Sequence, residues 1–210
     1  MAIVWPCALS VDEYVAAGRE LEVPRPDCPA CSAPMGSWSG YPRYVRSEGW
    51  SRRLWIKRAR CRACGTTHAL LPAFVVARRL DAAETIGTVI AELVEGPGGV
   101  RPAAERAAVP HTTARDWWRR FRARAAGLAA GFAALTIELG AAVRTPSGTP
   151  AARALGATND AFAVACTFPG WLALSWIRFL NVVAGGRWLA TNTNSPYLVV
   201  GRRRFMAPVP

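Results

Sequence analysis

The sequence predicts an α+β protein with a small β zinc ribbon, a helical helix-turn-helix domain and an apolar, mainly helical C-terminal region. Two Cys-x-x-Cys pairs flank runs that mix apolar and basic residues, apolar residues then recur with helical spacing, and the C-terminal part is apolar and rich in tryptophan. The expected boundaries are an N-terminal segment over 1–24, the ribbon over 25–78, the helix-turn-helix over 79–126, a helix end and linker over 127–150, and the C-terminal region over 151–210.

The net charge narrows the class of partner. Among 210 residues, 26 are Lys or Arg and 14 are Asp or Glu, which gives a net charge of +12, and Lys57 is the only lysine. Arginine carries a planar fork of donors that suits phosphates and guanine edges, so a polyanionic partner is expected: DNA, RNA or an anionic membrane surface. A GC-rich genome also enriches Arg together with Ala, Gly and Pro. The distribution of the arginines along the chain therefore has to decide between a binding surface and genome composition.

The N-terminal residues lack the basic stretch and long apolar run of a signal peptide. With six cysteines and no export signal, we expect a cytoplasmic, nucleoid-associated protein whose paired cysteines bind metal instead of forming disulfides. The uncharged stretch 161–177 has the minimum length for a membrane span, but Pro169-Gly170 divides it. Two buried helices broken at Phe168-Pro169-Gly170 explain this stretch better than a helix that spans a membrane.

Two cysteine pairs have the spacing of a structural metal site. Cys28 and Cys31 form the first pair, Cys61 and Cys64 form the second, and residues 32–60 separate them. Each Cys-x-x-Cys turn places two sulfurs on one side of a tight knuckle, and two knuckles supply the four thiolates of tetrahedral Zn²⁺. Strands are expected to complete a zinc ribbon at 41–46, 52–60 and 68–72, with a turn over 47–49.

Four thiolates leave no open position for water, so the Zn²⁺ is expected to be structural and not catalytic. Iron is the alternative, because rubredoxin-like sites use similar pairs, although those proteins are usually acidic. His68 is an alternative ligand, but a structural or phosphate-contacting role is favoured because the shell is already full. Cys7 and Cys166 stand alone and are expected to be core thiols.

The predicted hairpin is strongly basic, with Glu48 as its one acidic residue and Arg62 continuing the run. Aromatic residues are interleaved at Tyr41, Tyr44, Trp50 and Trp55. Basic and aromatic side chains on a ribbon can hold phosphates and stack on bases. The alternative is a solvated strand face over a small aromatic core, with Trp55 inside it. The residues expected to contact nucleic acid are Arg43, Arg46, Arg52, Arg53, Lys57, Arg58 and Arg60.

Three helices are expected after the ribbon. Asp81 is a suitable N-cap for the first, whose apolar residues recur to Val94 before Gly96-Pro97-Gly98-Gly99 ends it. A short second helix covers 100–107, and 108–110 form a turn. Thr112 or Thr113 caps the third helix, whose buried stripe contains Phe121 and either Trp117 or Trp118.

In a helix-turn-helix this third helix enters the major groove, and its N-terminal residues meet the bases. The alternative is a small helical bundle with solvated arginines. The side chains expected nearest the bases are His111, Thr112, Thr113, Arg115 and Asp116, and those nearest the phosphates are Arg119, Arg120 and Arg122.

The C-terminal region is expected to be core packed on the helix-turn-helix, or else a docking surface. A helix is expected from Gly170 to Val183, ended by Gly185-Gly186. Asn192, Asn194 and the Arg202–Arg204 cluster are further candidates for phosphate contacts.

Residues 28–31 and 60–72 followed by a helix-turn-helix resemble an uncharacterised actinobacterial family of zinc-ribbon/helix-turn-helix proteins, over roughly residues 25–125. The order is also similar to the DNA-recognition modules of insertion-sequence transposases and of transposon accessory proteins. The resemblance implies DNA recognition and a mobile element, and it brings no catalytic residues. A transposase nuclease needs three carboxylates, whereas residues 126–210 contain Glu138 and Asp160.

These observations predict a non-catalytic protein that binds duplex DNA, as a transposition accessory or target-recognition factor. The alternatives are a transcriptional regulator and an RNA- or ribosome-binding zinc-ribbon module. Catalysis is disfavoured because the sequence lacks a phosphate loop, an Ser-His-Asp set and an open metal site. A transposase, an ATPase, another protein or a second copy of the chain is the expected partner of the C-terminal region.

Overall fold

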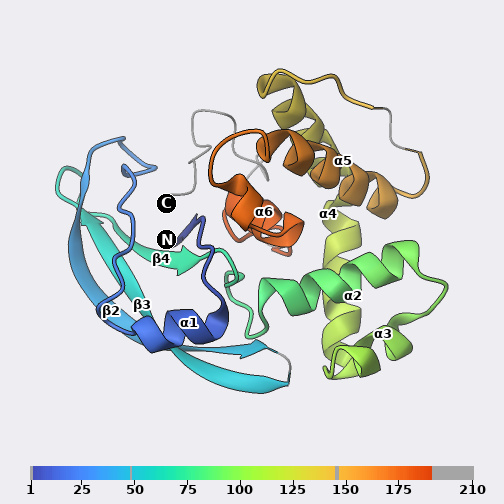
Figure 1. The fold of residues 1–210 in the computed structure, drawn as a ribbon, viewed down its shortest axis with the longest axis horizontal. Helices are drawn as coiled ribbons and strands as arrows, with labels where there is room; N and C mark the ends of the chain where they lie inside the picture. The colour runs from blue at the N-terminus through green and yellow to red at the C-terminus, as the bar shows by residue number, and fades with distance from the viewer. Residues whose placement is uncertain (1, 48, 145–146, 191–210) are drawn as a thin grey trace.

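The structure is a computed structural model that describes residues 2–47, 49–144 and 147–190. It is a mixed α/β fold in which a four-stranded sheet packs beside a layer of helices (Figure 1). None of the described helices is long and apolar enough to cross a membrane. The elements are β1 (Ala2–Trp5), α1 (Val11–Ala17), β2 (Met35–Ser47), β3 (Trp50–Cys61), β4 (Thr67–Pro72), α2 (Ala83–Glu95), α3 (Val100–Arg106), α4 (His111–Glu138), α5 (Pro150–Ala165), the 3₁₀ turn η1 (Trp171–Ala173) and α6 (Trp176–Val183).

The sheet has the strand order β1-β4-β3-β2. The β2–β3 hairpin and the antiparallel β3–β4 pair lie where the sequence predicts strands. The fourth strand, β1, comes from the N-terminal segment and pairs in parallel with β4, from Ala2 opposite Ala69 to Trp5 opposite Pro72. The sheet is therefore built from both the N-terminal segment and the predicted ribbon.

The far end of the hairpin is tied to the entry of the helical layer. The backbone N–H of Arg46 donates to the carbonyl of Leu80 at 2.7 Å, and the N–H of Ala82 donates back to Arg46 at 2.8 Å. The buried Asp81 forms an ion pair with Arg46, whose Nε donates to the carboxylate at 2.6 Å. The prediction that Asp81 caps α2 is wrong: Ala82 occupies the cap position without a side-chain hydrogen bond, because the carboxylate is committed to Arg46.

Three helices follow at the predicted positions, and the described turn between α3 and α4 covers residues 107–110. The long helix α4 buries one stripe, in which Trp117 and Phe121 are followed by Leu128 and Phe132. Its N-cap is Pro110, with no side-chain cap, so the predicted capping by Thr112 or Thr113 is wrong. Pro110 fixes the backbone angle at the helix entry without a hydroxyl.

The C-terminal region forms core against α4, as predicted, with Trp171, Phe179 and Trp188 almost fully buried. The chain breaks between α5 and η1, which agrees with the predicted break at Pro169-Gly170. The helix predicted from Gly170 is shorter: η1 ends in extended backbone at Leu174, and Ser175 caps α6.

Two polar side chains of α6 join distant parts of the chain. Arg178 donates to the carbonyls of Cys7 at 3.0 Å and Leu9 at 2.8 Å, and it pairs with Glu84 of α2. The buried Asn181 amide donates to Ala73 at 2.7 Å and to a second carbonyl in the same segment, and its oxygen accepts from the Trp188 indole at 3.0 Å. These contacts hold β1, β4, α2 and α6 as one body.

Candidate metal centre and nucleic-acid surface

The two cysteine knuckles have matching backbone geometry. In the first, the N–H of Ser32 donates to the carbonyl of Cys28 at 2.7 Å. In the second, the N–H of Gly65 donates to the carbonyl of Cys61 at 3.1 Å. The residue after the second cysteine of each knuckle is left-handed, with φ of 59° at Ser32 and 70° at Gly65. Glycine adopts this conformation without a Cβ penalty, and serine accepts it because the knuckle's hydrogen bonds hold it.

The knuckles bring four sulfurs together, as predicted. The Sγ atoms of Cys28, Cys31, Cys61 and Cys64 all lie within 4.8 Å of one another. Two contacts cross between the knuckles, with Cys31 3.4 Å from Cys61 and Cys28 3.7 Å from Cys64. A tetrahedron with metal–sulfur bonds of ~2.3 Å has sulfur–sulfur edges of roughly 3.8 Å, so these positions fit one metal ion.

The thiols also show why a cation suits this cluster. The hydroxyl and backbone of Thr66 lower the pKa of Cys64 to about 6. A backbone hydrogen bond at Ala33 lowers the pKa of Cys31, but the Cys61 sulfur, desolvation and the sulfurs of Cys64 and Cys28 together outweigh it, and the pKa of Cys31 is raised to about 12. Thiolates this close repel one another, so a bound cation is what would allow all four to ionise together.

His68 is buried beside the cluster, and its Nε2 lies 3.6 Å from Cys28 Sγ. Burial lowers the pKa of His68, which favours the neutral ring. A phosphate cannot reach a buried side chain, so the phosphate-contacting alternative is wrong and the structural one holds. A neutral imidazole N–H can donate to a metal-bound thiolate, as second partners of metal ligands commonly do.

Several basic residues of the hairpin hold the fold together. Arg43 donates to the carbonyls of Val76 and Arg79, and burial lowers the pKa of its guanidinium. Arg46 pairs with the buried Asp81, as described above. Arg58 donates to the Thr67 hydroxyl at 2.9 Å. These arginines position strands, which leaves less of the predicted charge for a ligand.

The remaining basic residues of the hairpin lie nearer the solvent. Arg53 is exposed and Lys57 is half-buried. Arg52 is half-buried and pairs with Asp12 at 2.7 Å, on a carboxylate that is 76% exposed. An ion pair this exposed contributes little to stability, so a phosphate can compete for the arginine.

The N-terminal half of α4 presents a basic face. The exposed side chains are His111, Thr112, Arg115, Arg119 and Arg122, and Thr113 is half-buried. Arg115, Arg119 and Arg122 recur at the spacing of one helix face. On the opposite face, the buried stripe anchors α4 to the core. The helix thus exposes most of its own residues that the sequence assigns to nucleic-acid contact.

Asp116 and Arg120 form an ion cluster beside this face. Asp116 accepts from Arg119 at 2.7 Å and from Arg120 at 2.6 Å, and Arg79 lies 3.5 Å away. Partial burial raises the pKa of Asp116, but the hydrogen bonds from Arg119 and Arg120 outweigh it, so its pKa is lowered. The predicted base contact of Asp116 therefore competes with three arginines, and Arg120 is only 24% exposed.

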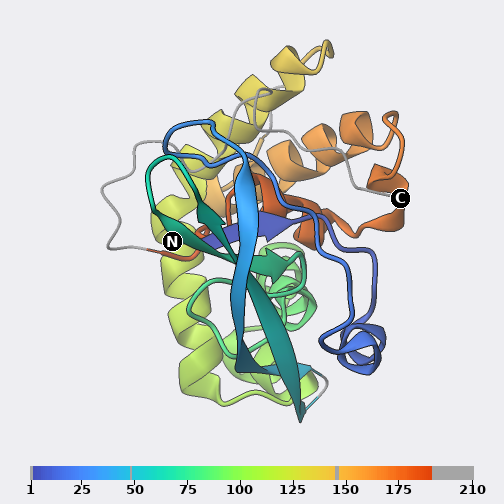
Figure 2. The same cartoon turned by 90° about the vertical axis from the view of Figure 1, so that its left-hand side faces the viewer.

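The hairpin tip lies at the same end of the molecule as α3 (Figures 1 and 2). A Cβ built on Gly49 would lie 3.9 Å from the Cβ of Ala108, in the turn that precedes α4. Trp50 at this tip is 69% exposed. The tip therefore lies beside the turn that leads into α4, so one ligand could touch the tip and the start of the helix.

Comparison with known proteins adds one match. Residues 28–117 match a family model described as a domain of unknown function (DUF6431). The matched region runs from the first knuckle through the buried Trp117 of α4, and it covers less than half of the 210 residues. No curated protein and no solved structure matches the chain.

Sequence reasoning passed over Arg79 and Trp38. Arg79 lies outside the predicted elements, and only the fold places it beside Asp116. Trp38 is 53% exposed in β2, between Ser37 and Ser39. An indole between two small polar residues, next to a basic run, is a signal that could have been read. The predicted contacts at Asn192, Asn194 and Arg202–Arg204 lie outside the described residues.

Proposed function

We propose that this chain is a non-catalytic, zinc-dependent protein that binds duplex DNA through α4 and the tip of the β2–β3 hairpin. The observation that carries the proposal is the basic exposed face of α4 next to the exposed hairpin tip. Two neighbouring surfaces can contact the same stretch of duplex, one in a groove and one on the flanking backbone.

Zn²⁺ is proposed as the ion of the cysteine cluster. Four thiolates in a tetrahedral arrangement are the preferred ligands of structural zinc. When bound, the ion would supply cross-linking of the two knuckles and no reactive chemistry, because all four positions are protein sulfurs. Cys28, Cys31, Cys61 and Cys64 would hold it, and His68 would donate to one of the thiolates.

Within this proposal the residues of α4 have different tasks. Arg115 is exposed on the first turns of α4 and makes no ion pair with a carboxylate in the described part of the chain, so its guanidinium is available for a guanine edge. Arg119 and Arg122 lie further along the same face and would contact phosphates. Asp116 would hold Arg119 and Arg120 in position instead of reading bases.

The biological role follows from the resemblance noted above, which implies recognition of a target or an end of a mobile element. A footprint on DNA from the chain's own locus separates the two DNA-binding roles. Protection of an element end would support a transposition factor, and protection of a promoter would support a transcriptional regulator. Tighter binding to structured RNA than to duplex DNA would support the ribosomal or RNA-binding alternative instead.

We predict that Arg115→Ala lowers the preference of the zinc-loaded protein for its cognate duplex by about 1–3 kcal/mol, if Arg115 reads a guanine. Arg119→Ala should weaken cognate and random duplex equally, because phosphate contacts carry no sequence information. The measurement is fluorescence anisotropy across a salt series, in which log affinity should fall linearly with log salt.

The matched control is Arg153→Ala, which removes one exposed arginine from α5. This variant should bind like the wild type. If all three variants lose affinity equally on every duplex, the effect is one of net charge, and the proposed duplex surface is wrong.

A further inference from the structure

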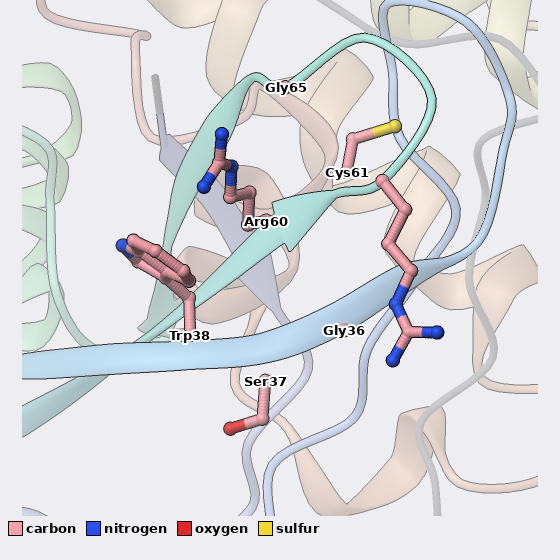
Figure 3. Close-up of a pocket in the computed structure, with 7 residues that line it drawn as sticks. Gly36, Ser37, Trp38, Arg60, Cys61 and Gly65 are labelled. Carbon is pink, nitrogen blue, oxygen red and sulfur yellow. The ribbon is translucent and has the colours of Figure 1, made fainter.

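A pocket opens on the hairpin near the metal centre, at the opposite end from the α4 face (Figure 3). It has a volume of about 370 Å³, and Ser37, Trp38, Arg60 and Arg62 contribute to its lining. Pockets of this size take small ligands. The lining combines one aromatic ring, one hydroxyl, two guanidinium groups and the Cys61 side chain of the metal centre. None of the α4 residues assigned to nucleic-acid contact takes part.

Trp38 is presented to solvent by an irregularity of the hairpin. The register shifts between Ser37, opposite Ala59, and Ser39, opposite Arg58, so Trp38 is the extra residue of a β-bulge in β2. Bulges commonly re-aim a side chain at a functional site. The indole is 53% exposed even though the Arg60 guanidinium lies 4.7 Å from its ring centre. The remaining ring surface is open to a second planar group.

The two arginines of the pocket are available to an anion. Both are exposed, and neither pairs with a carboxylate in the described ranges. Arg62 lies against Gly36, where a Cβ would come within 3.5 Å of its Nε. Arg62 therefore packs beside Gly36, and Arg60 lies over the Trp38 ring, so both guanidinium groups border the same pocket as the indole. An indole and two guanidinium groups around one pocket suit a nucleotide, which has a planar base and an anionic phosphate.

We propose that this pocket holds an unpaired DNA nucleotide, with its base stacked on Trp38 and its phosphates on Arg60 and Arg62. The inference rests on the proposed duplex binding, because the duplex would deliver the strand to the pocket. β3 has 12 residues, which at ~3.3 Å per residue span roughly 40 Å. The pocket would therefore lie about one helical turn of DNA from the hairpin tip, which is beside the turn that leads into α4.

The experiment compares a blunt duplex with the same duplex carrying a single-stranded thymine tail, at fixed salt and with zinc bound. A series of duplex lengths moves the tail relative to the site read by α4. We expect the wild type to bind the best tailed duplex roughly 5- to 100-fold more tightly than the blunt one, as stacking of one base allows. Trp38→Leu should lose that gain, and Trp38→Phe should keep much of it because it retains a ring.

A direct readout supports the affinities. A 2-aminopurine placed in the tail should lose fluorescence when it stacks on the indole, in the wild type but not in Trp38→Leu. Bound zinc and the unfolding midpoint of each variant check that the exposed substitution leaves the fold intact.

The outcomes separate the two proposals. Equal affinity of the wild type for tailed and blunt duplex, or a full tail preference in Trp38→Leu, would overturn the pocket assignment while duplex binding stands. Absence of salt-dependent binding to the blunt duplex would overturn the duplex proposal. If the duplex proposal fails in this way but the isolated single-stranded tail still binds and needs Trp38, the nucleotide pocket remains supported without duplex binding.

Discussion

Asp116 illustrates how a single residue connects the fold to the proposed surface. Its carboxylate receives three arginines, of which Arg79 comes from the segment before α2 and Arg119 and Arg120 come from α4 itself. The spacing of Arg119 and Arg120 from Asp116 is that of side chains on one helix face. Removing the carboxylate would leave three positive groups close together, so Asp116 stabilises the basic surface that it adjoins.

We predict that Asp116→Asn destabilises the protein at neutral pH and that this cost disappears in acid. The pKa of Asp116 is lowered in the folded state, so its contribution is fully present above the ordinary aspartate value of ~3.9 and is lost as pH falls through the lower folded value. Denaturant unfolding of both proteins at a series of pH values measures the difference. A difference that stays constant below pH ~4 would contradict the ion cluster.

At the scale of elements, the hairpin and α4 depend on different forces. The helix buries a continuous apolar stripe, in which Trp117, Phe121 and Leu128 are almost fully buried and Phe121 contacts Trp188. The hairpin has buried residues at Val45, Leu54 and part of β3, but its knuckle end is largely exposed. A metal ion would supply the stability that a small core cannot.

We predict that removal of the metal loosens the knuckle end of the sheet and leaves the helical layer folded. After chelation, backbone amides of β2, β3 and the two knuckles should exchange with deuterium faster, and amides of α4 and α5 should keep their protection. Hydrogen exchange read by mass spectrometry makes this measurement. Re-addition of Zn²⁺ should restore protection, and Cys61→Ser should not respond to the metal. Uniform loss of protection across the chain would show that the metal stabilises the whole molecule.

Most elements could be predicted from local patterns. The Cys-x-x-Cys spacing predicts the knuckles, alternation predicts the hairpin, and helical spacing ended by glycine predicts α2 and α4. The errors concern side chains with two potential partners. Asp81 is an excellent cap by type, but Arg46 is a closer partner for its charge. Local pattern cannot weigh a cap against an ion pair with a residue thirty-five positions away.

At the scale of the whole molecule, contacts between distant segments determine the shape. Arg178 of α6 binds the carbonyls that follow β1, and it also pairs with Glu84 of α2. Asn181 joins the segment after β4 to Trp188, with its amide nitrogen donating two hydrogen bonds and its oxygen accepting one inside the core. The candidate surface is thus supported by residues that lie far from it in sequence.

We predict that Arg178→Met lowers the free energy of unfolding by about 3 kcal/mol, because it removes a largely buried charge partner and leaves Glu84 and three carbonyls without a donor. Arg153→Met, on an exposed part of α5, should change stability little. Urea unfolding monitored by tryptophan fluorescence compares the two. Equal, small effects would mean that the N-terminal segment is held by its strand pairing alone.

The long-range pairings were beyond sequence reasoning. Residues 2–5 carry no alternation, and nothing in them indicates that their partner is 69–72. The pocket around Trp38 was missed for a similar reason, because a bulge depends on how two strands meet and not on the composition of either. The four cysteines were the exception, because the Cys-x-x-Cys spacing within each pair is enough to predict that they lie together.

The grip of Arg178 on the Cys7–Leu9 carbonyls has a consequence for synthesis on the ribosome. The knuckles and hairpin are contiguous and can take up metal early, because domains fold as the chain emerges. The carbonyls of residues 7–9 are synthesised long before Arg178, which donates hydrogen bonds to them in the folded protein. If the knuckles bind metal as proposed, a nascent chain would hold the metal before Arg178 is made, and a chain terminated before α6 would lack the contacts that fix the Cys7–Leu9 carbonyls.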